Sequence, residues 1–217
     1  MVSTLFLVPT EFEKSFLSLG LLEQIENGKS AIRICGFGPI VSGIRTSQLI
    51  AEHSPMQVFL IGIAGTLDLR FRVGTAVEFD LAICFGIGAG SGDGFIAASE
   101  LGWHHWPDDP LISDSIPLIA ENSPLNAENS EQCVPLLTCC SASANEHDVQ
   151  LRLKKYPKAS AEDMEGFSVA AACRFAGLPL RIVRGISNRA GDRNKDNWQV
   201  REAMSAVEKS ILKVLCS

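Results

Sequence analysis

The chain has 217 residues and a formal net charge of −6, and 46% of its residues are hydrophobic while 20% are charged. This composition is typical of a globular protein with a sizeable core and excludes a disordered or fibrous chain. The negative charge and the lack of any Lys/Arg-rich run in the sequence exclude a broad nucleic-acid surface. The longest apolar run, Val58 to Ala64, is far too short to cross a membrane.

The N-terminal segment Met-Val-Ser-Thr-Leu-Phe-Leu-Val-Pro has no cationic lead and no small-residue cleavage site. We therefore expect a first strand there rather than a signal peptide. The seven cysteines include the adjacent pair Cys139 and Cys140 but form no Cys-x-x-Cys motif. These features predict a cytoplasmic protein with reduced cysteines, most of them small buried hydrophobes.

Apolar runs of strand length alternate along the chain with amphipathic stretches of helical length. We expect strands at 4–8, 31–35, 58–63, 77–85, 134–140 and 180–186, and helices at 11–19, 40–52, 146–155, 165–176 and 198–215. Several of the strands are apolar without alternation, as expected when helices cover both faces of a sheet. The sequence therefore predicts one domain, residues 1–217, built as a three-layer α/β/α sandwich with a central mixed sheet.

Two segments do not fit this alternation. The stretch from Gly86 to Gly94 has five glycines in alternate positions. Because it lacks the Gly-x-Gly-x-x-Gly spacing and no helical pattern begins there, it predicts a mobile loop rather than a dinucleotide-binding turn. Residues 107–132 are rich in Pro, Asp, Asn, Glu and Ser, which predicts an exposed excursion that is either a functional lid or poorly ordered.

Three polar positions could carry chemistry, although each also has a structural explanation. Glu13 lies three residues after Thr10, and this spacing fits a capping box that opens a helix. Glu165 opens the helix expected at 165–176, where an acid favours the helix dipole. Asn188 follows a strand and suits an ordinary helix cap. Equally, a carboxylate can act as a general base or accept hydrogen bonds from two vicinal hydroxyls.

Two segments carry a family resemblance. Ala161-Glu-Asp-Met-Glu-Gly-Phe167 resembles the ribose-binding Met-Glu segment of the purine nucleoside phosphorylase and nucleosidase superfamily. Arg184-Gly-Ile-Ser-Asn188 resembles the base-reading Ser-Asp/Asn segment of the same superfamily. Together with Gly185-Ile-Ser-Asn-Arg-Ala-Gly-Asp-Arg193 and Trp198, they make the chain most similar to the futalosine hydrolases.

Two glycine-containing turns extend the resemblance. Gly62-Ile-Ala-Gly65 resembles the Gly-x-Ala-Gly turn that lies against the bound nucleoside, where small residues let the backbone approach a ligand. Gly36-Phe-Gly-Pro39 is similar to the Gly-x-Gly-Pro that futalosine hydrolases favour before the next helix.

The resemblance implies hydrolysis of the N-ribosidic bond of futalosine to hypoxanthine and dehypoxanthinyl futalosine, a step of menaquinone biosynthesis. It implies that Glu13 activates the attacking water and that Asn188 stabilises the departing purine, so these two are the expected catalytic residues. The expected substrate-binding residues are Ala64, Gly65, Ala142, Ser143, Met164 and Glu165. Either Arg189 or Arg193 is a candidate partner for the benzoate carboxylate of futalosine.

The choice of base depends on Asn188 and on the pair Ala142-Ser143. Nucleosidases that release adenine have Asp at the first position and an aromatic residue near the second. An amide can offer N–H to N7 and O6 of hypoxanthine, whereas a carboxylate would repel O6, so Asn188 favours a 6-oxopurine. A methylthioadenosine/S-adenosylhomocysteine nucleosidase, a purine nucleoside phosphorylase and a non-catalytic nucleoside-binding protein remain the alternatives.

We expect no metal and no cofactor, because His104 and His105 have no carboxylate or cysteine at a metal-ligand spacing and the sequence holds no Walker motif. The expected partners are a nucleoside substrate and water, with neither nucleic acid nor membrane. Members of the family commonly dimerise, so the resemblance also implies a homodimer.

Overall fold

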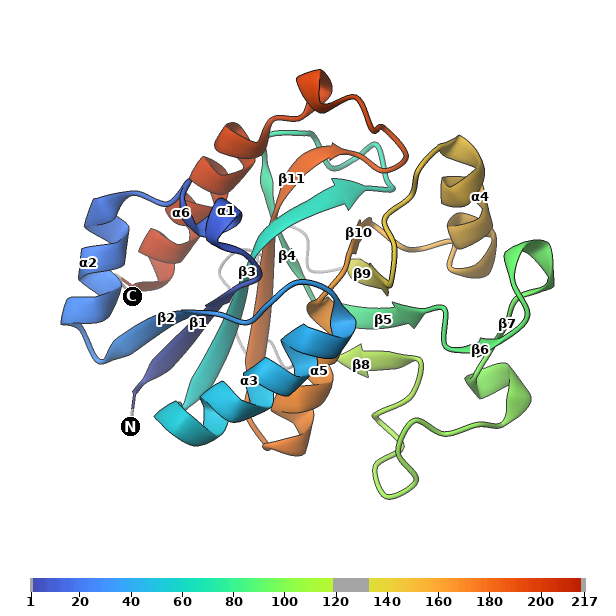
Figure 1. Ribbon diagram of the computed structural model, residues 1–217, viewed down its shortest axis with the longest axis horizontal. Helices are drawn as coiled ribbons and strands as arrows, with labels where there is room; N and C mark the ends of the chain where they lie inside the picture. The colour runs from blue at the N-terminus through green and yellow to red at the C-terminus, as the bar shows by residue number, and fades with distance from the viewer. Residues whose placement is uncertain (1, 119–132, 216–217) are drawn as a thin grey trace.

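The computed structural model describes residues 2–118 and 133–215 (Figure 1). The strands are β1 (Thr4–Val8), β2 (Ser30–Ile34), β3 (Gln57–Thr66), β4 (Ala76–Phe79), β5 (Leu81–Phe85), β6 (Gly88–Ala89), β7 (Ile96–Ala97), β8 (Ser115–Pro117), β9 (Pro135–Cys139), β10 (Ala161–Asp163) and β11 (Leu180–Arg189). The α-helices are α1 (Glu11–Lys14), α2 (Leu19–Asn27), α3 (Pro39–His53), α4 (Glu146–Lys155), α5 (Gly166–Phe175) and α6 (Val200–Leu215), and three short 3₁₀ turns cover Gly92–Gly94, Ser99–Leu101 and Lys195–Asn197.

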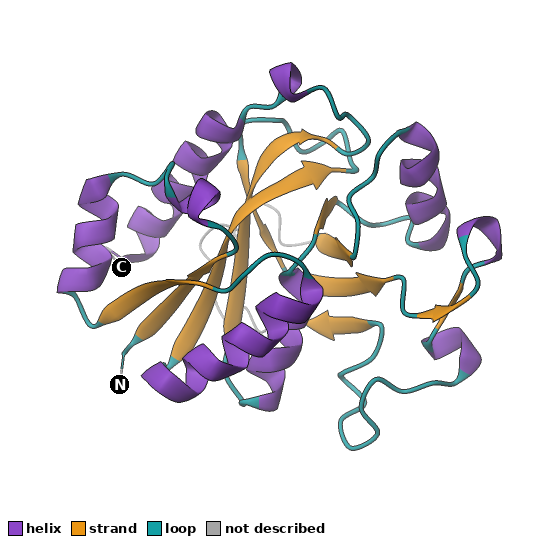
Figure 2. Cartoon of the chain, viewed as in Figure 1, coloured by secondary structure: helices purple, strands orange, loops and turns teal. Residues whose placement is uncertain are grey.

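The nine-stranded central sheet is mixed, as predicted. Its order is β2-β1-β3-β10-β9-β5-β8, and β11 pairs with both β3 and β4. The pairs β1–β2, β1–β3 and β11–β3 are parallel, whereas β11–β4 and β10–β3 are antiparallel. Figure 2 shows the sheet with helices on both sides.

The two faces of β1 contribute to two separate cores, which confirms the three-layer prediction. Leu5 and Leu7 belong to a cluster that includes residues of α3 and α5. Phe6 and Val8 belong to a second cluster with residues of α2 and α6. Successive side chains of a strand point to opposite faces, so an uninterrupted apolar strand requires a helix layer on each side. Burying one such side chain contributes about 1.5–3 kcal/mol to folding.

The helix predicted at residues 11–19 is wrong in its extent. Helix α1 ends at Lys14, and a new helix, α2, begins after Ser18 and continues to Asn27. The Ser18 hydroxyl accepts a hydrogen bond from the Leu21 N–H, which caps the N-terminus of α2. Leu21 and Ile25, one turn apart, then pack into the core.

Two strand predictions also need correction. The strand predicted at 77–85 is divided at Asp80, whose carboxylate accepts the Val134 N–H, so β4 pairs with β11 while β5 pairs with β9. Gly62-Ile-Ala-Gly65 was predicted as a turn after a strand, but it continues β3, because β11 pairs with β3 as far as Thr66.

Asn188 does not lie at the start of a helix. It belongs to β11, just after an irregularity in the register between Ile186 and Asn188. The predicted helix-cap explanation for this residue is therefore wrong. Glu165, in contrast, is the N-cap residue of α5, although its side chain makes no capping hydrogen bond.

The glycine-rich segment predicted as a loop, 86–94, contains the two-residue strand β6 and one 3₁₀ turn, and β6 pairs antiparallel with β7, which follows the segment. Of the excursion predicted at 107–132, residues 119–132 lie outside the described part of the chain. Residues 115–117 form β8 at the edge of the sheet, a strand that the sequence did not predict.

Of the six cysteines in the described residues, Cys35, Cys139 and Cys173 are buried, while Cys133 and Cys140 are exposed. All six are free thiols. No helix within residues 2–118 and 133–215 is long and apolar enough to cross a membrane.

Candidate functional site

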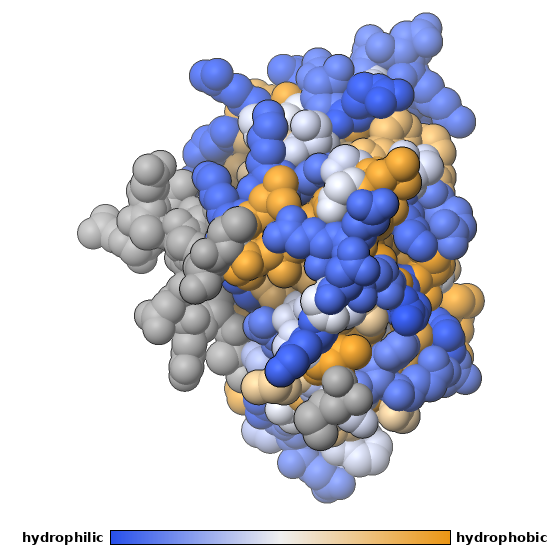
Figure 3. Space-filling model, turned by 90° about the vertical axis from the view of Figure 1, so that its left-hand side faces the viewer, coloured by the Kyte–Doolittle hydropathy of each residue, from blue (hydrophilic) through white to orange (hydrophobic). Residues whose placement is uncertain are grey.

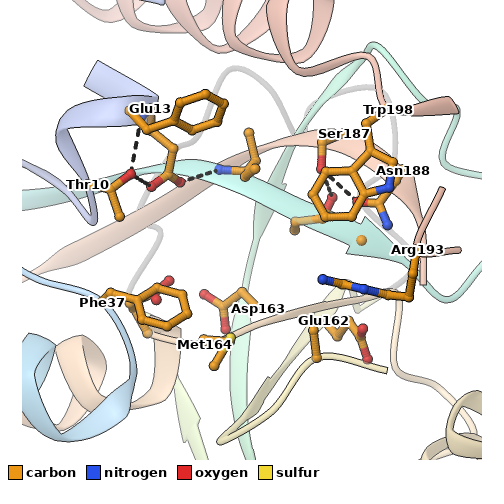
Figure 4. Close-up of a pocket in the computed structure, with 16 residues that line it drawn as sticks. Thr10, Glu13, Phe37, Glu162, Asp163, Met164, Ser187, Asn188, Arg193 and Trp198 are labelled. Carbon is orange, nitrogen blue, oxygen red and sulfur yellow. Dashed lines mark hydrogen bonds between the residues drawn. The ribbon is translucent and has the colours of Figure 1, made fainter. Parts of the chain in front are cut away.

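A cavity of about 290 Å³ opens beyond the C-terminal ends of the parallel strands β1, β3 and β11 (Figure 4). Ligands of α/β proteins commonly bind at such an edge. The cavity is lined by Thr10, Phe12, Glu13, Phe37, Ile63, Ala64, Gly65, Ala142, Glu162, Asp163, Met164, Glu165, Ser187, Asn188, Arg193 and Trp198. Seven of the eight residues proposed from the sequence lie in this wall, and Ser143 does not.

Glu13 is held in the wall by the residues around it. Its Oε2 accepts a 2.6 Å hydrogen bond from the Thr10 hydroxyl, and its Oε1 accepts a 3.0 Å bond from the Ile63 N–H. Thr10 also caps α1 by accepting the Glu13 N–H, so half of the predicted capping box is present. Glu13 is therefore part of the helix cap and of the cavity wall at once. The residue is 5% exposed and lines the cavity.

Arg184 is completely buried and connects the carboxylates behind the cavity. Its Nη2 donates to Asp163 Oδ2 at 2.5 Å and to Glu165 Oε2 at 3.1 Å. Burial alone would lower the pKa of Arg184, but Asp163, Glu165 and Glu13 raise it well above its usual value. The guanidinium therefore stays charged, as a buried cation surrounded by acids requires.

Glu165 is in an environment that disfavours its charged form. Its Oε1 accepts the Gly38 N–H at 3.0 Å, so the Gly36–Pro39 turn packs directly on this carboxylate. Burial raises the pKa of Glu165 to about 7, and the nearby Asp163 and Glu13 add to this effect, while Arg184 opposes it. Near neutral pH this group can either accept or donate a proton.

Asn188 uses its amide to hold the chain that follows it. Its Nδ2 donates to the backbone carbonyls of Arg189, at 2.7 Å, and Asp192, at 3.5 Å. Its Oδ1 accepts the Ser187 hydroxyl at 2.8 Å. Because two carbonyls face Nδ2 and a hydroxyl faces Oδ1, the orientation of the amide is fixed by its partners.

Ser143 lies behind the cavity wall rather than in it. It is fully buried, and its N–H and hydroxyl both donate to the Glu162 carboxylate, at 2.8 and 2.7 Å. Arg152 lies 3.1 Å from the same carboxylate. Through these contacts, Glu162 fixes the segment that places Ala142 in the cavity wall.

No role is predicted from the sequence for Arg184 or Glu162. A signal for the first was present, because Arg184 interrupts the apolar run Leu180 to Ile186, and a charge inside a buried strand requires a buried partner. Glu162 gave no comparable signal, since its partners Ser143 and Arg152 are distant in sequence and follow no motif. Within residues 2–118 and 133–215, no group of three or more His, Cys, Asp or Glu side chains could hold a metal ion.

A family model, described as the phosphorylase superfamily, matches residues 18–217. The chain belongs to the phosphorylase superfamily. Within it, the chain is similar to curated futalosine hydrolases: 30% identical over 156 residues to that of Streptomyces coelicolor and 28% over 180 residues to that of Acidothermus cellulolyticus. The matched segments cover 70% and 82% of this chain, but only 62% and 71% of the two relatives.

Solved structures of the superfamily share the fold over almost the whole chain. The futalosine hydrolase of Helicobacter pylori matches with a TM-score of 0.72 at 16% identity, covering 98% of both chains. A 5′-methylthioadenosine/S-adenosylhomocysteine nucleosidase of Colwellia psychrerythraea, in complex with adenine, matches with a TM-score of 0.77 at 18% identity, covering 99% of this chain and 95% of the other. At such identities the likeness establishes the fold and does not discriminate between substrates.

Proposed function

We propose that this protein hydrolyses the N-ribosidic bond of futalosine, releasing hypoxanthine and leaving dehypoxanthinyl futalosine. The observation that carries the proposal is one cavity that brings together Glu13, Met164-Glu165 and Asn188 from distant parts of the chain. The curated relatives named futalosine hydrolase support this choice of substrate. A role in menaquinone biosynthesis and a cytoplasmic location are parts of the same proposal.

Glu13 is the proposed general base. Each of its oxygens accepts one hydrogen bond, from Thr10 or Ile63, and therefore keeps a second lone pair for a water molecule in the cavity. As the bond between C1′ and the purine breaks, its electron pair leaves with the base. The water oxygen bonds to C1′ and one of its protons passes to Glu13, a type of assistance that contributes about 10²–10⁴-fold. The departing purine anion takes up a proton from solvent water and becomes hypoxanthine.

Arg184 is proposed to hold the Glu13 carboxylate in position from behind the cavity wall. Its Nη1 and the Glu13 Oε1 both lie beside Gly62, at 2.4 and 2.6 Å from the point that a side-chain carbon there would occupy. Nη1 has no hydrogen-bond partner among the described residues. The opposite charges of the two groups attract each other across the short gap between them, and this attraction is proposed to keep the Glu13 carboxylate in place.

Met164 and Glu165 are proposed to bind the ribose. The ionised carboxylate of Glu165 can accept from two vicinal hydroxyls, and the Met164 thioether offers an apolar surface to the sugar. Glu165 is held in place by Gly38 and Arg184. It is therefore preorganised before a nucleoside enters.

The proposal is tested by mixing the purified protein with futalosine and separately with methylthioadenosine, with and without phosphate. We expect hypoxanthine from futalosine at a rate independent of phosphate, and little or no adenine from methylthioadenosine. A rate that requires phosphate would make the protein a phosphorylase, faster adenine release would make it a methylthioadenosine nucleosidase, and binding without release would make it a nucleoside-binding protein.

We also propose a homodimer formed through the outer surface of α3 and α5. Ile40, Val41 and Ile44 on α3 are 76%, 53% and 60% exposed, and Phe175 on α5 is 59% exposed. Ile40, Ile44 and Phe175 line an apolar hollow of about 640 Å³ to which both helices contribute. On the face shown in Figure 3, by contrast, small apolar groups are separated by hydrophilic side chains.

An apolar surface of this kind usually marks an interface. Light scattering should give twice the mass of one chain for the wild type, and Ile44→Glu should shift the mass toward that of a monomer. Leu69→Glu, at another strongly exposed apolar position, is the matched control and should leave the mass unchanged. A monomeric wild type would contradict the proposal.

A further inference from the structure

Asn188 is poorly placed to act alone as the donor to the purine. Its two amide hydrogens face the carbonyls of Arg189 and Asp192, and only its Oδ1 keeps a free lone pair. A 6-oxopurine presents two adjacent acceptors, N7 and O6, on the edge that has to be read. This edge requires a donor from elsewhere in the cavity wall.

Arg193 is such a donor. Of the described residues that line the cavity, it alone is cationic. Figure 4 shows its guanidinium extending into the cavity, between Glu162 and the side chains of Trp198 and Asn188. No carboxylate in the described part of the chain forms an ion pair with it, although Glu13, Asp163 and Glu165 line the same cavity. Its guanidinium also donates no hydrogen bond to another described residue, so its N–H groups can meet a ligand.

Several contacts hold the loop that carries Arg193. The guanidinium carbon lies 5.1 Å from the centroid of the Trp198 ring, in a cation–π contact. The Trp198 Nε1–H donates to the Asp192 carbonyl at 3.0 Å, the same carbonyl that faces Asn188. The Asp192 carboxylate in turn accepts the Asn197 amide at 2.8 Å.

Gly191 anchors this loop against the N-terminal end of α4. Its φ is +81°, and a side-chain carbon there would lie 2.8 Å from the Asn145 carbonyl oxygen. Glycine is therefore required for the loop to approach so closely. The loop backbone beside Arg193 is thus held against α4, and a side chain held in place before a ligand arrives lowers the entropic cost of binding.

We propose that Arg193, positioned by Trp198, binds N7 and O6 of the 6-oxopurine base through the two arms of its guanidinium. The same geometry lets arginine read the N7 and O6 edge of guanine in nucleic acids. Adenine has an amine in place of O6. This amine is a hydrogen-bond donor, so it cannot pair with the N–H donors of the guanidinium. Arg193 would thus select the base and stabilise the negative charge that develops on it as it leaves.

This proposal deepens the proposed function, but its test uses the free bases and not turnover. Calorimetric titration should show wild type binding hypoxanthine more tightly than adenine. Arg193→Gln should weaken hypoxanthine binding by roughly tenfold or more, the usual size of one bidentate base contact. Adenine binding should stay within about threefold. Arg189→Gln, a neighbouring exposed arginine outside the cavity lining, is the control and should change neither.

Trp198 is the positioning residue, so a conservative change should preserve its role. Trp198→Phe keeps an aromatic face for Arg193 and should retain the preference for hypoxanthine, whereas Trp198→Leu should lose it. Circular dichroism checks that each variant is folded. If Phe and Leu at this position behave alike, Trp198 does not act through Arg193.

The results separate this proposal from the proposed function. Hypoxanthine affinity that is unchanged in Arg193→Gln, or an equal loss for both bases, overturns the role of Arg193. A separate titration with futalosine in which Arg193→Gln weakens the binding of futalosine alone also overturns it, and would assign Arg193 to the carboxylate of that substrate. If wild type binds hypoxanthine through Arg193 but does not cleave futalosine, the proposed function fails and the inference stands.

Discussion

The carboxylate of Glu13 and the guanidinium of Arg184 both lie close to Gly62: a side-chain carbon there would be 2.6 Å from Oε1 and 2.4 Å from Nη1. Glu13 follows β1, Gly62 lies within β3 and Arg184 lies within β11. Three strand regions therefore meet at the carboxylate that is proposed to activate the attacking water.

Gly62→Ala should separate this pair and abolish most of the activity. Real side-chain carbons essentially never approach other atoms so closely, so Glu13 or Arg184 has to move. A misplacement of about 1 Å can cost roughly 10²-fold in rate. Turnover of futalosine is the measurement.

Gly94→Ala is the matched control, because a side-chain carbon there would meet nothing within 4 Å. It should leave turnover unchanged. Full activity in Gly62→Ala would show that the Glu13–Arg184 arrangement is not needed for catalysis.

Glu13→Gln should lower turnover by about 10²–10⁴-fold, the usual scale of general base assistance. The fold should persist, since glutamine can still accept the Ile63 N–H, and the Thr10 hydroxyl can reverse its role and accept. Nucleoside affinity should also persist, because Glu13 is not the proposed ribose ligand. Turnover, affinity and melting temperature are measured together.

Glu11→Gln changes an exposed acid in the same short helix and should leave turnover unchanged. Unchanged turnover with a lower melting temperature in Glu13→Gln would mean that Glu13 serves only to cap α1.

Local patterns predicted the elements whose stability depends on local residues. β1 and α4 have the predicted bounds. In α4, Asn145 caps the first turn, and acids precede bases along the helix, as the helix dipole favours. Seven of the eight expected catalytic and substrate-binding residues also line one cavity, because the motifs that name them match residue by residue. Their roles stay predictions.

What the sequence did not predict depends on distant partners. β10 is three residues long, Ala-Glu-Asp, and two of these are buried acids. It forms a central strand only because Arg152 and Ser143 satisfy Glu162 while Arg184 and Thr138 satisfy Asp163. A strand this short and polar has no hydrophobic periodicity from which it could be predicted. Asn188 was misplaced for a similar reason, since pairing with β3 extends β11 beyond its apolar run.

The raised pKa of Glu165 predicts opposite pH dependences for stability and for ligand binding. Between the ordinary value of 4.5 and the folded value of about 7, the folded state holds a proton that the unfolded state has released. The contribution of Glu165 to stability therefore falls as pH rises through this window. Nucleoside affinity should rise over the same window, because the ionised carboxylate is the better acceptor for the ribose hydroxyls.

Glu165→Gln removes the titrating group and isolates its contribution. The melting temperature of Glu165→Gln, measured relative to that of the wild type, should rise from pH 5 to pH 8. Glu52→Gln, in an exposed ion pair on α3, should show no such trend. A wild type whose stability relative to Glu165→Gln does not change with pH would show that Glu165 titrates normally.

Asn188→Asp tests whether the amide reads the base, holds the loop, or does both. A carboxylate places oxygens against the carbonyls of Arg189 and Asp192, where Asn188 now donates. Such a mismatch costs about 1–3 kcal/mol, so the melting temperature should fall. If the side chain also reads a 6-oxopurine, kcat/KM for futalosine should drop roughly ten- to a hundredfold. The kcat/KM for a 6-aminopurine nucleoside should rise relative to that for futalosine, because Asp can accept a hydrogen bond from the exocyclic amine.

Asn197→Asp provides the matched control, since Asn197 also donates to Asp192, through the carboxylate, but does not line the cavity. It should weaken the loop without changing the ratio of kcat/KM for futalosine to that for the aminopurine nucleoside. A ratio that moves toward the aminopurine only in Asn188→Asp assigns base reading to the amide. A ratio unchanged in both variants, with a lower melting temperature in Asn188→Asp, would leave Asn188 as the support of the loop and base selection to Arg193.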